Sequence, residues 1–145
     1  GFPGGLPSDV TPWVAVDEEG WPWVASDSVH RDETRPHLDA SWGVARATFI
    51  GGWETFTVDD GLLSNDATLI PGDGGEMWAV HSNLPPFGYS HFDGQDWTAY
   101  PTEKRPGDGL RGIYLDGRVL TVSAEGHLVS FDGVRQEIHP SPFLP

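Results

Sequence analysis

The sequence has 145 residues, which is enough for one ordinary domain with its own hydrophobic core. Its formal net charge is −14 and its 8 Lys and Arg residues are scattered, so nucleic acids and anionic membrane surfaces are disfavoured as partners. The absence of Cys excludes disulfides and thiolate metal sites, and no stretch approaches the roughly 18 apolar residues of a membrane-spanning helix.

The first unit of predicted structure covers residues 5–58. The chain opens on Gly1-Phe2-Pro3 without an initiating Met, from which we expect a processed chain or a segment of a longer protein. Alternation and turn residues predict strands near residues 10–17, 21–26, 42–49 and 53–58. A charged insertion, residues 27–41, separates the second of these strands from the third and is too long and polar to belong to a sheet.

The second unit covers residues 61–101 and the third covers residues 108–139. Strands are expected near 66–71, 76–81, 87–92 and 96–100, and then near 110–115, 118–123, 127–131 and 134–138. Asp-Gly pairs at 93–94, 116–117 and 132–133 predict tight hairpin turns, because Gly tolerates the positive φ that such turns demand. No segment has a helical period with caps at both ends, so the predicted fold class is all-β.

The three units repeat one another at the start and at the second strand. The opening motif occurs as Gly5-Leu6-Pro7-Ser8, as Gly61-Leu62-Leu63-Ser64 and more weakly as Gly109-Leu110-Arg111-Gly112. The strand around Trp23 recurs around Trp78, and Leu120 takes the equivalent place in the third unit. Internal repeats of this length indicate an array or a propeller.

The ends of the units repeat as well. Phe92-Asp93-Gly94 recurs as Phe131-Asp132-Gly133, and Phe49-Ile50-Gly51 is the expected counterpart in the first unit. Four-stranded antiparallel sheets that repeat every ~40–50 residues are typical of β-propeller blades. A β-sandwich is the alternative, but it would not require the same motifs to return in the same order. We predict three four-stranded antiparallel blades, half or part of a ring, in a single segment over residues 1–145.

The repeated motifs resemble those of the two-component-regulator propeller repeat. The resemblance rests on Gly61-Leu62-Leu63-Ser64-Asn65, the Trp78 strand and Phe92-Asp93-Gly94 with Trp97, and it covers about residues 5–139. It is weakest in the third unit, where Leu120 replaces the strand Trp. Because such repeats occur in sensor regions of bacterial signalling proteins, the resemblance implies a bacterial, extracytoplasmic protein. It carries over no catalytic residue.

Three blades leave the outer faces of the first and third blades uncovered. Closed propellers need about four to eight blades, and large exposed apolar faces rarely persist on a monomer. We therefore expect these faces to be covered by a second copy in a homodimer, by another propeller-blade chain, or by further blades of a longer parent chain.

The candidate ligand-binding residues lie mainly in loops expected on one face of the ring. They are His30, Arg31, Arg35, His37, His81 and Asn83, with Trp21 and Trp42 as possible stacking platforms for a ligand. A solvated excursion without a ligand is the alternative for the insertion. The 6 His residues form no HxxxH or HxH pair on one element, so neither a metal nor a cofactor is predicted.

The main functional hypothesis is a non-catalytic interaction or sensor module that presents its loops to a protein or a small molecule. One alternative is a carbohydrate-binding propeller, and another is a propeller lyase or glycosidase with its site at the channel mouth. The chain has no Gly-x-Ser-x-Gly elbow and no Cys, which gives nucleophilic catalysis little support. A catalytic group on a missing half would keep the enzyme alternative open.

Overall fold

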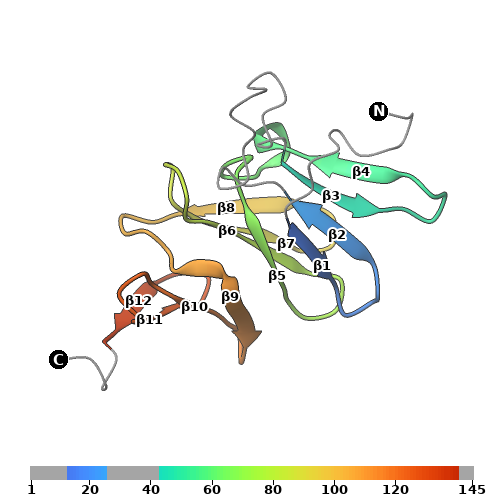
Figure 1. Ribbon diagram of the computed structural model, residues 1–145. Helices are drawn as coiled ribbons and strands as arrows, with labels where there is room; N and C mark the ends of the chain where they lie inside the picture. The colour runs from blue at the N-terminus through green and yellow to red at the C-terminus, as the bar shows by residue number, and fades with distance from the viewer. Residues whose placement is uncertain (1–12, 26–42, 141–145) are drawn as a thin grey trace, which may run out of the picture.

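The computed structural model in Figure 1 describes residues 13–25 and 43–140 of the chain. These residues form three antiparallel four-stranded sheets with almost no helix, which confirms the all-β prediction. In each sheet every strand pairs with the next strand along the chain. Within the described ranges, no helix has the length and apolar character needed to span a membrane.

We name the sheets A, B and C in chain order, and their strands lie within a residue or two of the predicted positions in most cases. Sheet A consists of β1 (Trp13–Val16), β2 (Pro22–Ala25), β3 (Val44–Ala47) and β4 (Trp53–Phe56). A short 3₁₀ helix, η3 (Val58–Asp60), leads to sheet B, which consists of β5 (Thr68–Pro71), β6 (Met77–His81), β7 (Gly88–Phe92) and β8 (Trp97–Pro101). Sheet C consists of β9 (Asp108–Leu115), β10 (Arg118–Val122), β11 (Leu128–Phe131) and β12 (Gln136–His139).

The Asp-Gly pairs form two kinds of turn. Asp116 and Gly117 both have positive φ and join β9 to β10 in a two-residue hairpin, as predicted. Asp93 instead begins a longer turn, in which its carboxylate accepts hydrogen bonds from the backbone N–H groups of Gln95 and Asp96. Asp132 does the same for the two N–H groups that follow Gly133. The acidic side chains therefore close these turns themselves.

Sheet B lies between sheets A and C (Figure 1), and its two faces are buried in two separate cores. The sheets approach one another most closely at their first strands, because β5 contacts β1 on one side and β9 on the other. We call the face of a sheet that points toward the next sheet along the chain its front, and the opposite face its back. For sheet C, the front is the face opposite the core shared with sheet B.

The core between sheets A and B is built around aromatic side chains. Trp23 and Phe56 on the front of sheet A pack against Phe92 and Trp97 on the back of sheet B, with Trp23 and Phe92 centroids 5.3 Å apart. The indole Nε1 of Trp13 also donates to a backbone carbonyl of β5 at 3.0 Å. Large aromatic surfaces bury much apolar area per residue and favour edge-on and offset contacts of this kind.

The core between sheets B and C repeats this arrangement. Trp78 on the front of sheet B packs edge-on against Phe131 on the back of sheet C, with ring centroids 5.9 Å apart. Tyr89 stacks on the same Phe131 ring at 4.2 Å, and its hydroxyl donates to the Gln136 side chain. On β9, Gly112 gives Ile70 of sheet B room to approach, because a Cβ there would collide with the Ile70 side chain.

Strand pairing identifies the equivalent residues of the three units. Trp23, Trp78 and Leu120 occupy one position, as predicted, since each lies on the second strand opposite Arg46, His91 or Ser130. A second set of equivalent positions ends the third strands: Ala47 pairs with Trp53, Phe92 with Trp97 and Phe131 with Gln136.

Two of the predicted correspondences are wrong. Phe49 lies in the turn between β3 and β4, and the residue equivalent to Phe92 is Ala47. The turn in sheet A is longer than the one in sheet B, so matching the two Phe residues shifted the alignment by two positions. Gly109 lies inside β9, whereas Gly61 lies before β5 with a left-handed φ of 107°. The third copy of the opening motif is therefore not structurally equivalent to the second.

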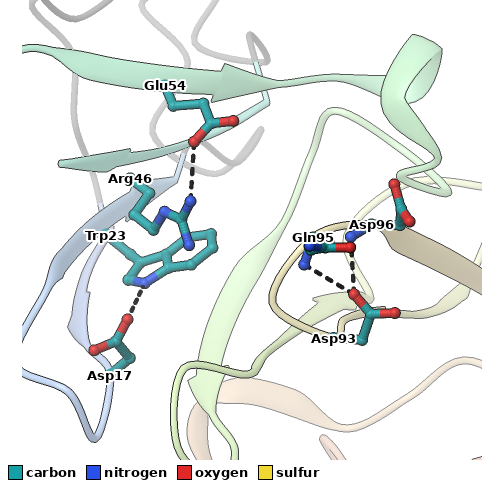
Figure 2. A network of polar contacts seen from close by, with 7 residues as sticks. All are labelled: Asp17, Trp23, Arg46, Glu54, Asp93, Gln95 and Asp96. Carbon is teal, nitrogen blue, oxygen red and sulfur yellow. Dashed lines mark hydrogen bonds and ion pairs between the residues drawn. The ribbon is translucent and has the colours of Figure 1, made fainter. Parts of the chain in front are cut away.

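The buried carboxylate of Asp17 connects the first turn to the core of sheet A. It accepts hydrogen bonds from the backbone N–H groups of Glu19 and Trp21 and, at 2.9 Å, from the indole Nε1–H of Trp23 (Figure 2). On the opposite side of this indole, Arg46 lies 5.4 Å from the ring centroid and pairs with Glu54 at 3.0 Å. The orientation of Trp23 is thus fixed from both sides.

Replacing Asp17 tests how much this network stabilises the fold. Asp17→Ala would leave the buried indole N–H and two turn N–H groups without their acceptor, and we expect a loss of about 2–4 kcal/mol in unfolding free energy. Urea unfolding followed by tryptophan fluorescence measures this loss.

Asp93→Ala is the matched control. Asp93 accepts the same kind of turn hydrogen bonds but lies exposed and contacts no indole N–H, so its removal should cost clearly less. Equal losses in the two variants would show that the bond to Trp23 contributes nothing measurable.

Candidate functional site

Three of the predicted ligand-binding residues lie in the described part of the chain: Trp21, His81 and Asn83. The others, namely His30, Arg31, Arg35, His37 and Trp42, lie outside the described residues. Trp21, His81 and Asn83 therefore represent the predicted binding face in the described part of the chain.

His81 ends β6 and is fully buried. Its Nδ1 lies 2.9 Å from the backbone carbonyl of Asp66, and its Nε2 lies 2.7 Å from the hydroxyl of Ser90. Because a carbonyl can only accept, Nδ1 carries the proton and donates to it, while Nε2 accepts from the Ser90 hydroxyl. The Ser90 oxygen in turn accepts from the backbone N–H of Leu63. Every group of this network has a partner when the imidazole is neutral.

Burial lowers the pKa of His81 from 6.5 to about 4, against the smaller opposing effect of its bond to the Asp66 carbonyl. A neutral His beside a Ser hydroxyl resembles a catalytic pair, but Ser90 is also fully buried, so neither side chain faces solvent. In this arrangement His81 joins β6 to β7 and to the segment before β5. It does not present itself to a ligand at the surface.

Asn83 lies close to this network in the loop after β6. Its side-chain amide lies 3.5 Å from a carboxylate oxygen of Asp66, and its backbone carbonyl accepts from Arg105 at 3.3 Å. Arg105 also bonds to the carbonyl of Ser82 and lies over the ring of Phe87. Asn83 is therefore part of a set of contacts that ties this loop to the segment after β8.

Ser64 and Asn65 lie in the segment between η3 and β5, and both side chains bond to backbone N–H groups. The Ser64 hydroxyl accepts from the backbone N–H of Asp66, and the Asn65 side-chain oxygen accepts from the backbone N–H of Val58. The polar residues at this end of sheet B bond mainly to one another and to the backbone.

Trp21 lies in sheet A, just before the start of β2, and is half-buried. Its ring meets Phe49 in a T-shaped contact with centroids 4.4 Å apart. Phe49 is 90% exposed in the turn between β3 and β4. The pair offers aromatic surface to solvent, but it is a single pair at one hairpin tip, and Trp42 lies outside the described residues.

Residues 13–25 and 43–140 contain no group of three or more His, Asp or Glu side chains placed to hold a metal ion. Several carboxylates are instead engaged within turns, as described above for Asp17, Asp93 and Asp132.

The front of sheet C exposes a group of apolar side chains to solvent, with Arg118 and Glu137 at its margins. Ile113 of β9 pairs with Leu120 of β10, and Val122 pairs with Leu128 of β11, so these four side chains lie together on one face. Ile113 is 55% exposed and Leu128 is 42% exposed. Leu115 lies on the same face, next to the hairpin that joins β9 to β10, and is 52% exposed.

The back of sheet A is the second apolar outer face. Val14 pairs with Val24, which pairs with Ala45, and Val16 and Ala47 follow two residues further along their strands. Val14 is 60% exposed and Val16 is 54% exposed, whereas Trp13 and Ala15 between them point into the core with sheet B. Val24 and Ala45, in the middle of the same face, are buried, so the expectation of an uncovered outer face on the first sheet is met only along β1. The front of sheet C is the candidate interaction surface.

Sequence reasoning predicted that such outer faces exist but named none of their residues. The signal was present, because Val14 and Val16 alternate with inward-facing residues, and Ile113 and Leu115 flank the inward-facing Tyr114. Alternation alone does not show which face of each strand a neighbouring sheet covers.

Comparisons with protein-family models, with curated proteins and with solved structures found no match to this chain.

The His81 network predicts a stability that depends on pH. The unfolded chain binds a proton on this residue near pH 6.5 and the folded chain only near pH 4, so the unfolded state binds more protons between these values. Stability should therefore fall by about 3 kcal/mol as the pH is lowered from about 7 to about 4. Urea unfolding at a series of pH values measures this loss.

His81→Gln should be less stable than the parent at pH 7 and should lack this part of the pH dependence. A matched control is His127→Gln, which removes a partly exposed His from the turn before β11. The same change of pH profile in both variants would contradict the assignment to His81.

Proposed function

We propose that this chain is a non-catalytic interaction module of the β-propeller type. In this proposal sheets A, B and C are three blades, and the exposed front of sheet C accepts a further blade. Ligand sensing through the loops and an extracytoplasmic location are further expectations, which rest on the resemblance to the two-component-regulator propeller repeats.

One observation carries the proposal. Trp23 and Trp78 are equivalent by strand pairing, and both are buried because the front face that each belongs to packs on the next sheet. Leu120 is the third member of this set, and the front face of sheet C that surrounds it has no further sheet upon it. A face that is buried in two of three copies of a repeat is expected to be buried in the third.

The chemistry of the two outer faces supports this expectation. Terminal repeats that end an array against solvent usually carry a polar outer face. Here the first strand of each outer sheet instead exposes aliphatic side chains: Val14 and Val16 on the back of sheet A, Ile113 and Leu115 on the front of sheet C. Transferring each such side chain from water into an interface contributes about 1–2 kcal/mol before the costs of association.

The arrangement of the sheets supports a ring. Sheets A, B and C are closest at their first strands, β1, β5 and β9, which lie side by side in Figure 1. Repeated rotation about such an inner edge leads to a closed propeller after about four to eight sheets. Sheets that stacked without converging would not close.

A charge placed on the front of sheet C tests the proposal. Ile113→Glu would put an unpaired carboxylate in the interface, and we expect it to weaken association by about 100-fold or more. Sedimentation velocity over a range of micromolar concentrations compares the variant with the parent, which should sediment as an assembly larger than one chain.

Val134→Glu is the matched control. Val134 is 90% exposed but lies in the turn between β11 and β12, away from both outer faces, so its substitution should leave association unchanged. A specific interface should have a dissociation constant well below about 100 µM. A parent chain that is folded and still monomeric at that protein concentration would overturn the proposal.

A further inference from the structure

The segment that connects β4 to β5, residues 57–67, crosses the back of sheet B, and we call it the strap. We propose that the strap is an acid-released element, which detaches from sheet B when His81 is protonated while the strands of the sheet stay paired. This inference is independent of the proposed function, because the front of sheet C takes no part in it.

The strap passes over sheet B one strand at a time. Gly61 lies so close to β8 that a Cβ there would come within 2.5 Å of a carbonyl oxygen of that strand. The backbone N–H of Leu63 donates to the hydroxyl of Ser90 on β7 at 2.9 Å. The backbone carbonyl of Asp66 lies 2.9 Å from Nδ1 of His81 on β6. The strap therefore meets β8, β7 and β6 in turn before the chain becomes β5.

Several hydrogen bonds of the strap lie within the strap itself. Thr57 and Asp60 form a reciprocal capping box around η3. The side-chain oxygen of Asn65 accepts from the backbone N–H of Val58, and the hydroxyl of Ser64 accepts from the backbone N–H two residues further on. These bonds do not need to break when the strap leaves sheet B, so the strap is able to move as one unit.

The two hydrogen bonds that tie the strap to β6 and β7 share one buried pair. Nε2 of His81 accepts from the hydroxyl of Ser90 at 2.7 Å, and each member of the pair holds one point of the strap. Leu62, which is 3% exposed in the core shared with sheet A, is the apolar anchor of the strap. A change in the charge of the imidazole therefore acts on both polar anchors at once.

Protonation of His81 disturbs this pair in two ways. Both ring nitrogens of an imidazolium donate, so the Ser90 hydroxyl loses its acceptor, and its oxygen then faces the N–H of Leu63 and that of Nε2 together. The positive charge is also fully buried, which is why the pKa of His81 is lowered from 6.5 to about 4. The charged ring is better accommodated once the strap has moved and water reaches it.

The charged groups described near the pair lie on the strap and on a neighbouring segment. The Asp66 carboxylate of the strap lies 3.5 Å from the side-chain amide of Asn83. Arg105, after β8, bonds to the backbone carbonyls of Ser82 and Asn83. The core residues of sheet A that pack with Leu62 are apolar. Burial is the largest influence on His81, so release of the strap depends on access of water to the ring and not on one ion pair.

Native-state hydrogen exchange of the parent chain, followed by NMR between pH 7 and pH 4, tests the strap. An opened state that exposes His81 takes up its proton near pH 6.5 and the closed state only near pH 4, so the open fraction should rise about 100-fold over this range. After correction for intrinsic exchange, the protection factor of the Leu63 N–H should fall by that amount. At every pH it should also be at least about tenfold lower than those of the amides that pair β6 with β7.

Two variants separate the proton from the anchor. In His81→Gln the protection of the Leu63 N–H should no longer change between pH 7 and pH 4. In Leu62→Ala, which weakens the apolar anchor and leaves the imidazole in place, this protection should be about tenfold lower than in the parent at each pH, with the same dependence on pH. The pH series of the parent decides the question alone if His81→Gln does not fold.

Two results would overturn the inference. If the Leu63 N–H is as strongly protected as the amides of the β6–β7 pairing, the strap opens only when the whole sheet unfolds. If it is less protected but its protection is constant from pH 7 to pH 4, the strap opens without exposing His81 and protons do not control it. Lower protection together with a fall on acidification supports the strap.

Discussion

The contact between a front-face Trp and the Phe of the next sheet is the interaction on which the described structure depends. It recurs at the centre of both cores, with Trp23 against Phe92 and Trp78 against Phe131. The contact requires each sheet to hold its Trp in one orientation, which in sheet A is achieved by Asp17 on one side and Arg46 on the other. The turn that contains Asp17 and the position of Arg46 over the indole both hold Trp23 in the orientation that this contact needs.

The acidity of the chain is partly a consequence of how its turns are built. Asp17, Asp93 and Asp132 each accept two backbone N–H groups in a turn between strands, and Asp17 also accepts from an indole. A carboxylate is well suited to this because it is an acceptor only. These acidic side chains therefore lie in turns at the ends of the sheets, and aliphatic side chains such as Ile113 and Leu115 are exposed on an outer face although the net charge is strongly negative.

The strands could be predicted from the sequence because alternation and Asp-Gly turns mark their ends. Equivalence between the units was harder: Phe49 was matched to Phe92 by residue type, whereas strand pairing makes Ala47 the equivalent. His81 was expected on a ligand-binding face but is buried, because β6 is covered on both sides and its residues show no alternation. Sequence patterns therefore predict where a strand lies along the chain, but not which sheets pack against its two faces.

The functional proposal rests on an outer face of the sheets and not on a single polar residue, because the repeat itself indicates which face is built to be buried. A repeat that buries its front face twice builds that face to be buried, and the third copy inherits the apolar positions with the fold. Selection against exposure would replace them with polar residues, as it does on the outward side of terminal repeats. Ile113 and Leu115 keep aliphatic side chains on the front of sheet C, so this face retains the composition of a face built to be buried.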